Sequence, residues 1–102
     1  MRNNYMTEKQ AEVIWSYMNR RLGVITTLGL NNELTIVQDV ALCILATPGI
    51  ILEDIIRHVY FHHVSRSTIK RAVNFLFTNG YIKTTKGLMD ARKNHLYFKK
   101  VD

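Results

Sequence analysis

Apolar residues recur at three- and four-residue steps along most of the chain, which is the spacing of helices that bury one face. The first such stretch follows Thr7-Glu8-Lys9-Gln10, a capping box in which the threonine and glutamine side chains bond to backbone N–H groups at a helix start. Its apolar positions are Ala11, Ile14, Trp15, Met18, Leu22 and Ile25. We therefore predict a helix over about 7–25, ended by Gly23 or by Thr26-Thr27.

A second helix is predicted from Thr35-Ile36-Val37-Gln38, which repeats the capping-box pattern. Its apolar positions are Val37, Val40, Ala41, Ile44 and Leu45. Thr47-Pro48-Gly49 ends it, because proline cannot continue a helix. The segment 28–34, with its glycine and two asparagines, is expected to be the connecting loop. Ile50-Ile51 is enough for a minimal strand.

A third helix is indicated by Leu52, Ile55, Ile56 and Val59, and it is expected to run to about Phe61. Glu53 and Asp54 would lie in its first turn, where acidic residues favour the helix dipole. Only His62-His63-Val64 separates it from Ser65, where the next helix starts. This fourth helix covers about Arg66 to Thr78, and Asn79-Gly80 closes it. Two β-prone runs at 81–85 and 95–99 then flank a polar segment, which indicates a hairpin with a long charged tip.

This order predicts a mainly α fold with a small β-hairpin. It is a winged helix-turn-helix with an extra N-terminal helix, the helix-turn-helix at about 52–79 and the wing at about 81–100. A length of 102 residues and the absence of repeats or linkers indicate one domain over 1–102.

Charge is distributed unevenly along the chain. Residues 1–56 carry four Lys or Arg and six Asp or Glu, which gives a net charge of −2. Residues 57–102 carry ten Lys or Arg and two Asp or Glu, which gives a net charge of +8. The whole chain has a formal charge of +6 at pH 7. The basic second half therefore favours a polyanionic partner.

Other features exclude several classes of protein. The longest apolar stretch, 40–52, is interrupted by proline and glycine and is too short for a bilayer span, and the polar N-terminus lacks a secretory signal. We therefore expect a cytoplasmic protein with no membrane partner. Cys43 lies among apolar residues and is expected to be an inert core thiol. No spacing suggests a nucleophile with its base, so we expect no enzymatic activity and no cofactor.

The histidines allow one alternative interpretation. His58 and His62 stand four apart on the predicted third helix, which is a possible zinc-binding spacing, but no third or fourth ligand lies nearby in the sequence. We therefore predict no metal site. His62 and His63 are expected in the turn before the fourth helix, where they would add pH-sensitive positive charge or hydrogen bonds toward a polyanionic partner.

The fourth helix has the chemistry of a DNA-reading helix. Ile69, Val73 and Leu76 share one face, with Ala72 at its edge, and no acidic residue occurs in 65–79. The opposite face offers only donors and mixed donor-acceptors, which suit phosphates and base edges. We predict DNA contacts from Ser65, Arg66, Ser67, Thr68, Lys70, Arg71 and Asn74, with Arg71 and Asn74 as base readers. Wing contacts are predicted from Lys86, Arg92, Lys93 and Asn94.

The segment Val64-Ser65-Arg66-Ser67-Thr68-Ile69-Lys70-Arg71-Ala72-Val73, with Leu76 and Gly80-Tyr81-Ile82, resembles the recognition helix of winged-helix transcription regulators. Asp90-Ala91-Arg92 followed by Leu96-Tyr97-Phe98 resembles the wing of the MarR/SarA group. The resemblance implies a DNA-binding regulator in which Asp90 orients a neighbouring arginine. MarR proteins continue past the wing into dimerisation helices, whereas this sequence stops at Asp102, as small phage- or plasmid-encoded regulators often do.

The N-terminal helix carries more apolar surface than a winged-helix core requires. We expect Trp15, Met18 and Leu22 to form a homodimer interface, because aromatic residues and methionine are enriched at interfaces. The predicted function is sequence-specific binding of double-stranded DNA by a homodimeric transcriptional regulator, with any small-molecule effector left open. Two alternatives remain: a DNA-binding adaptor in plasmid or phage partition or replication, and a winged-helix module for protein–protein contact.

Overall fold

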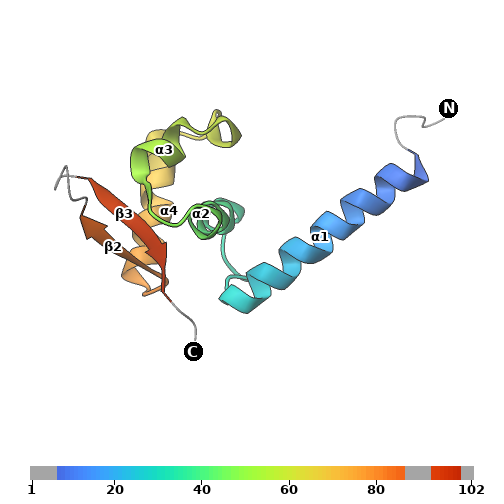
Figure 1. The fold of residues 1–102 in the computed structure, drawn as a ribbon, viewed down its shortest axis with the longest axis horizontal. Coiled ribbons are helices and arrows are strands. Elements are labelled where there is room, and N and C mark those ends of the chain that lie inside the picture. The colour runs from blue at the N-terminus through green and yellow to red at the C-terminus, as the bar shows by residue number, and fades with distance from the viewer. Residues whose placement is uncertain (1–6, 87–92, 100–102) are drawn as a thin grey trace. The chain divides into compact units, whose positions relative to one another are not determined.

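The computed structural model describes residues 7–86 and 93–99. The chain divides into two compact units, the first ending at Asn32 and the second beginning at Glu33. The first contains one long helix, and the second contains the shorter helices and the hairpin (Figure 1). The expectation of one domain over 1–102 stays a prediction.

Helix α1, Glu8–Leu28, forms the first unit and starts at the predicted capping box. The Thr7 hydroxyl accepts from the Gln10 N–H at 3.1 Å, and the Gln10 side chain accepts from the Thr7 N–H at 2.8 Å. The expected end at Gly23 or Thr26-Thr27 is wrong. The helix continues to Leu28, because Gly29 takes φ +76 and donates its N–H back to the carbonyls of the last turn.

The second unit has the predicted order of elements. They are α2 Thr35–Ala46, β1 Ile50–Ile51, α3 Leu52–Arg57, the 3₁₀ helix η1 Val59–Phe61, α4 Arg66–Thr78, β2 Ile82–Lys86 and β3 Asn94–Phe98. This is a mainly helical unit with a small antiparallel sheet, so the predicted winged helix-turn-helix architecture is confirmed.

Two local predictions in this unit are wrong. The second capping box does not form: α2 has Leu34 as its N-cap, with no side-chain hydrogen bond, and Thr35 is already helical. The third helix does not run unbroken to Phe61, because His58 takes an extended conformation with ψ 137°. The His58 Nδ1 accepts from the Tyr60 N–H at 3.1 Å and so caps η1.

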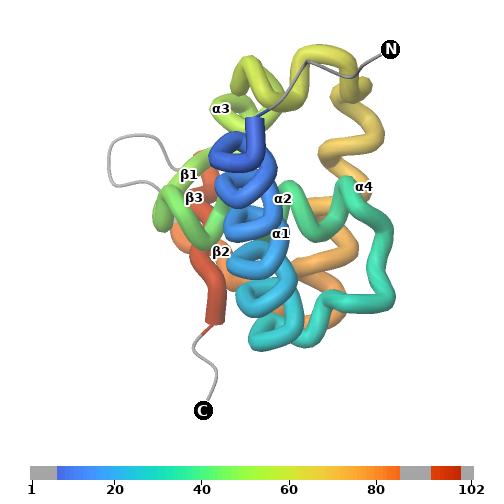
Figure 2. The backbone as a smooth tube through the Cα atoms, turned by 90° about the vertical axis from the view of Figure 1, so that its right-hand side faces the viewer, coloured from blue at the N-terminus to red at the C-terminus, as the bar shows by residue number. Residues whose placement is uncertain are grey.

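The sheet ties the wing to the rest of the unit. Its strand order is β1-β3-β2, and both pairs are antiparallel. The labels of the three strands lie close together in Figure 2. Ile51 of β1 pairs with His95 of β3, and Lys86 of β2 pairs with Asn94 of β3. The predicted minimal strand is therefore confirmed, and it anchors the hairpin beside α3.

Helices and strands of the second unit both contribute side chains to its hydrophobic core. Its buried side chains include Val40 and Ile44 of α2, Ile55 of α3, Ile69 and Leu76 of α4, Ile82 of β2 and Leu96 of β3. Because α4 and the hairpin both contribute, burial of this apolar surface fixes one against the other. Within the described part of the chain, no helix is long and apolar enough to cross a membrane.

Candidate nucleic-acid interface

Helix α4 presents the predicted polar face to solvent. Its N-cap is Ser65, whose hydroxyl accepts from the Thr68 N–H at 3.2 Å. Ile69, Ala72 and Leu76 are buried, while Val73 is half-buried, so Ala72 lies nearer the centre of the inner face than the sequence indicated. The exposed residues of α4 are Arg66, Ser67, Lys70, Arg71, Asn74, Phe77 and Thr78. This outer surface carries three positive charges, no negative charge and one large apolar side chain, that of Phe77.

Hydroxyl groups form a connected chain at the start of α4. The Ser65 Oγ lies 2.8 Å from the Thr68 Oγ1 and 3.2 Å from the Ser67 Oγ. A guanidinium nitrogen of Arg71 donates to the Thr68 Oγ1 at 3.4 Å. Four of the predicted DNA-binding residues therefore interact with one another before any ligand is present, which restricts their rotamers.

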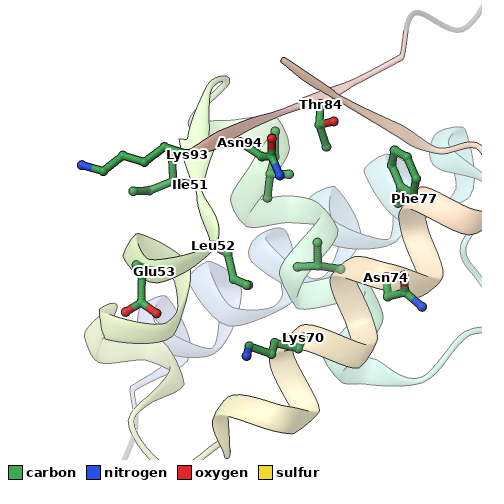
Figure 3. Close-up of a pocket in the computed structure, with 11 residues that line it drawn as sticks. Ile51, Leu52, Glu53, Lys70, Asn74, Phe77, Thr84, Lys93 and Asn94 are labelled. Atoms are coloured by element: carbon green, nitrogen blue, oxygen red, sulfur yellow. The ribbon is translucent and has the colours of Figure 1, made fainter. Parts of the chain in front are cut away.

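A groove of about 610 Å³ separates α4 from the hairpin. Figure 3 shows Lys70 and Asn74 on its α4 side and Lys93 and Asn94 on its β3 side. The floor is apolar and includes Val73 and Leu96. The fold thus brings together two residues of the predicted recognition helix and two of the predicted wing that are far apart in the sequence.

Arg71 lies on the other flank of α4. It lines a second groove, of about 340 Å³, together with Glu33, Leu34 and Ile36 from the start of α2 and with Phe75 of α4. The two residues predicted to read bases, Arg71 and Asn74, are therefore on different sides of the helix. Only Asn74 borders the groove that faces the hairpin.

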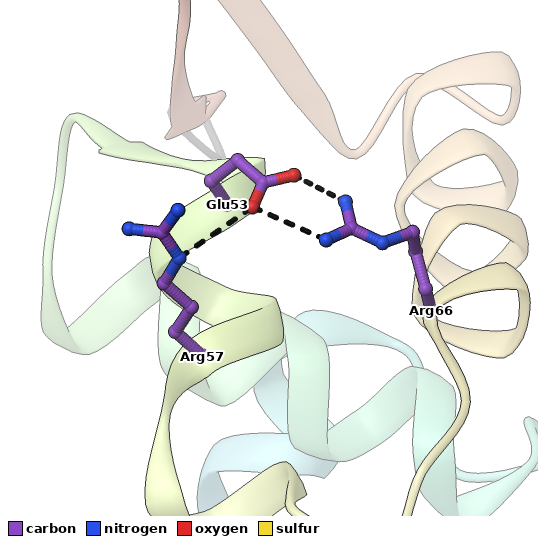
Figure 4. Close-up of polar contacts among 3 residues, drawn as sticks. All are labelled: Glu53, Arg57 and Arg66. Atoms are coloured by element: carbon purple, nitrogen blue, oxygen red, sulfur yellow. Dashed lines mark hydrogen bonds and ion pairs between the residues drawn. The ribbon is translucent and has the colours of Figure 1, made fainter.

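Arg66, a predicted DNA contact, is paired with Glu53 of α3. Its Nη1 donates to the Glu53 Oε1, its Nη2 lies 3.4 Å from Oε2, and Arg57 Nε lies 3.7 Å from the same oxygen (Figure 4). The hydrogen bond from Arg66 is the largest cause, and it lowers the pKa of Glu53. Burial raises this pKa by less than the hydrogen bond lowers it, and the charges of Arg66, Arg57 and Lys70 lower it further. Glu53 therefore stays ionised.

Sequence reasoning considered Glu53 only as an acidic residue in a helix's first turn. The structure places it on the edge of the groove that Lys70 and Lys93 also line. One feature of the sequence could have suggested an ion pair. Arg66 is the first residue of α4, and the turn before α4 is so short that Arg66 must lie near α3. Its partner, 13 residues earlier, could not be chosen without the fold.

The predicted contacts at the wing tip are only partly described. Lys93 and Asn94 are exposed. Lys86 ends β2 opposite Asn94, and its side chain lies outside what the structure describes. Asp90 and Arg92 also lie outside the described residues, so the proposed orientation of an arginine by Asp90 stays a prediction.

The histidines before α4 are exposed to solvent, whereas Cys43 is half-buried. His62 and His63 are exposed in the turn before α4. Among the described residues, no group of three or more His, Cys, Asp or Glu side chains could hold a metal ion. Cys43 is half-buried, and burial raises the pKa of its thiol, so the group is held in its protonated, unreactive form.

The predicted dimer residues all lie on α1 and are exposed. Trp15 is 62%, Met18 48% and Leu22 59% exposed. Val13 and Tyr17 on the same helix are 63% and 54% exposed. The apolar side chains of α1 therefore form a large exposed apolar surface on this helix. Their role in a dimer stays a prediction.

No protein-family model matches the sequence, and a search of curated proteins finds no relative. Solved structures, however, are similar to it. The crystal structure of MarR matches 92% of this chain with a TM-score of 0.58 and 21% sequence identity. The structure of Streptococcus pneumoniae FabT in complex with DNA matches 91% of this chain with a TM-score of 0.55 and 19% sequence identity. The transcriptional regulator SlyA matches with 0.55 and 20% over 92%.

The chain spans 66%, 66% and 64% of the lengths of MarR, FabT and SlyA. The identities are 19–21%, so the likeness concerns the fold. The chain therefore has the winged-helix fold of MarR, FabT and SlyA, which confirms the fold that its resemblance to the MarR group implied.

Proposed function

We propose that the chain binds double-stranded DNA in a sequence-specific manner and regulates transcription as a homodimer. The observation that carries this proposal is the exposed, acid-free outer face of α4, which borders the groove shared with Lys93 and Asn94. Amide and ammonium groups on a helix are suited to base edges in a major groove. Basic groups on an adjacent hairpin are suited to backbone phosphates.

The residues divide into two roles under this proposal. Asn74, Lys70 and Arg71 lie on the outer face of α4 and would contact base edges. Phosphate contacts would come from the start of α4, where Ser65, Arg66, Ser67 and Thr68 lie, and from the wing residues Lys86, Arg92, Lys93 and Asn94. The basic second half of the sequence supports this division, because phosphate neutralisation provides most of the affinity for DNA.

The similar structures support the same function. FabT from Streptococcus pneumoniae was solved in complex with DNA, and SlyA is a transcriptional regulator. Transfer of these properties to the present chain is our proposal, since the likeness itself concerns the fold. Under this proposal the chain is a binding protein rather than an enzyme and acts in the cytoplasm.

The homodimer follows from the exposed apolar surface of α1. Two copies joined through Trp15, Met18 and Leu22 would bury side chains that are otherwise in contact with solvent. A two-fold dimer of winged helices binds two half-sites one helical turn apart, about 10–10.5 bp centre to centre. The expected target is therefore an inverted repeat.

The experiment that tests the function is selection of bound sites from a pool of random duplex DNA, followed by titration of the selected duplex across salt concentrations. We expect an inverted repeat, with log K falling by about 0.9 per phosphate contact for each decade of salt. An affinity for duplex that is absent, or that does not change with salt, would contradict DNA binding and favour a protein-contact module. Direct or tandem repeats would favour a role in partition or replication.

A further inference from the structure

We propose that Glu53 is a positioning residue for DNA binding: it holds the guanidinium of Arg66 where a backbone phosphate meets the start of α4. The inference rests on the proposed function and deepens it. It also explains why an acidic side chain lines the groove beside Lys70 and Lys93. The carboxylate acts through the arginine and does not itself contact DNA.

Glu53 joins the two helices of the helix-turn-helix. It lies in the first turn of α3, and Arg66 is the first residue of α4. The two terminal nitrogens of Arg66 face the two carboxylate oxygens, as Figure 4 shows. A two-point pair of this kind fixes the plane of the guanidinium as well as its position.

Arg57 holds the carboxylate from the other side. It lies one helical turn after Glu53, and its Nε is 3.7 Å from Oε2. The side chains of Arg57 and Arg66 are still 77% and 54% exposed. Because two guanidinium groups flank one carboxylate, the cluster keeps one net positive charge and still attracts phosphate.

Orientation of Arg66 before DNA arrives makes its contact with phosphate stronger. A solvated arginine has many rotamers, and ordering them on binding reduces the affinity. Pairing with Glu53 uses one N–H of each terminal nitrogen and leaves the Nε–H and the outer N–H groups as donors. The side chain can therefore bind a phosphate while it stays attached to Glu53.

A purely structural role explains the pair less well. Helices α3 and α4 and the turn between them already bury Ile55, Phe61 and Ile69. Exposed ion pairs contribute little to folding stability, and the Glu53 side chain is 41% exposed. A lone carboxylate at this position would repel phosphate, so its presence in the groove is better explained by an improved contact through Arg66.

The test compares two variants of Glu53 in titrations of a labelled random-sequence duplex at a series of KCl concentrations. Glu53→Gln removes the charge and keeps the size, whereas Glu53→Asp keeps the charge and shortens the reach. We expect both to weaken binding by about three- to tenfold. The slope of log K against log [KCl] should become shallower by about 0.9, one lost phosphate contact. A Glu53→Gln variant that binds unchanged or more tightly would overturn the proposal.

Asp54→Asn is the matched control. It removes the same charge from the same helical turn, and Asp54 is exposed and forms no ion pair within the described part of the chain. Because only a repulsive charge is lost, we expect equal or slightly tighter binding. A loss as large as that of Glu53→Gln would overturn the proposal, since a general disturbance of the first turn of α3 would then explain both losses without the pairing to Arg66.

Arg66→Ala identifies the residue through which Glu53 acts. We expect it to weaken binding at least as much as Glu53→Gln, and the double variant to bind no more weakly than Arg66→Ala alone. Full additivity would overturn the proposal. Thermal unfolding of each variant separates a lost contact from a lost fold. A wild-type protein that binds no duplex would instead contradict the proposed function, and this inference with it.

Discussion

The phenol of Tyr97 lies against Gly49, where a β-carbon would stand 3.0 Å from the tyrosine oxygen. The Gly49 N–H donates to the Leu96 carbonyl at 2.8 Å, and the His95 Nδ1 lies 2.8 Å from the Gly49 carbonyl oxygen. Three successive residues of β3 thus contact one glycine in the turn after α2. These contacts hold the base of the wing against the turn that follows α2.

Gly49→Ala is therefore expected to lower the free energy of unfolding by about 1–3 kcal/mol. Gly49 has φ +89, which strains any residue with a β-carbon, and Tyr97 would have to move as well. Chemical denaturation measures the loss.

Gly23→Ala is the control for this prediction. Gly23 lies inside α1, and a β-carbon built there meets no atom within 4 Å apart from its chain neighbours and the backbone of its own helix. Alanine is the better helix former, so this change should raise the free energy of unfolding by about 0.5–1 kcal/mol. A loss of stability from both substitutions would show that the φ angle and the Tyr97 contact do not explain the effect at Gly49.

Acid is expected to remove the contribution of the Glu53 ion pair to stability. The hydrogen bond from Arg66 lowers the pKa of Glu53 in the folded state. A carboxyl group with a lowered folded pKa stabilises the fold above its unfolded pKa, about 4.3 for glutamate, and this stabilisation is lost as the pH falls through the folded pKa. The difference in Tm between wild type and Glu53→Gln should therefore favour wild type at neutral pH and shrink below about pH 4. A difference that is constant with pH would contradict this cause.

The sequence predicted those features that depend on local chemistry. Ser65 and Asn79-Gly80 marked the ends of α4, because an N-cap hydroxyl and a glycine with positive φ act within a few residues. The inner and outer faces of α4 followed from its periodicity, and Ile50-Ile51 was recognised as a strand from β-propensity alone.

Features that depend on tertiary neighbours could not be predicted in this way. The pairing of Arg66 with Glu53 requires the angle at which α3 meets α4. Periodicity placed Lys70 and Arg71 on one outer face, but the elements that flank α4 divide them between two grooves. The break after α3 occurs because the His58 side chain caps the 3₁₀ helix η1. The apolar residues alone would continue the helical pattern through this position.

The homodimer is tested by adding charge to the exposed apolar surface of α1. Trp15→Glu or Leu22→Glu should shift the protein from dimer to monomer in analytical ultracentrifugation, because a buried carboxylate at an interface loses its hydration. The helix content measured by circular dichroism should change little, since these side chains are 62% and 59% exposed within one chain.

Ser16→Glu adds the same charge to an exposed polar position of α1 that helical spacing places away from the face of Trp15, Met18 and Leu22, and it should leave the dimer intact. A wild-type protein that sediments as a monomer at tens of micromolar and binds a single asymmetric site would contradict the dimer. So would a dimer that survives both Trp15→Glu and Leu22→Glu.

Base reading by α4 is tested by comparing alanine variants on the selected duplex and on random duplex. Asn74→Ala should weaken binding to the selected site by about 1–3 kcal/mol, because a lost two-point contact with a base affects only the sequence that provides it. Arg71→Ala should also weaken binding to the selected site. The base pairs whose preference it relaxes should differ from those of Asn74→Ala, because Arg71 lies on the other flank of α4. Both variants should bind random duplex nearly as wild type does, so the ratio of specific to random affinity should narrow.

Lys93→Ala distinguishes sequence-specific base contacts from phosphate contacts that do not depend on sequence. Lys93 is exposed at the start of the second wing strand, on the far side of the groove from Asn74, and we expect it to contact phosphate. Its loss should weaken selected and random duplex alike and make the salt dependence shallower by about 0.9. If Asn74→Ala and Arg71→Ala also gave a uniform loss on both duplexes, α4 would be a phosphate-binding helix, and sequence would have to be read by another element of the chain.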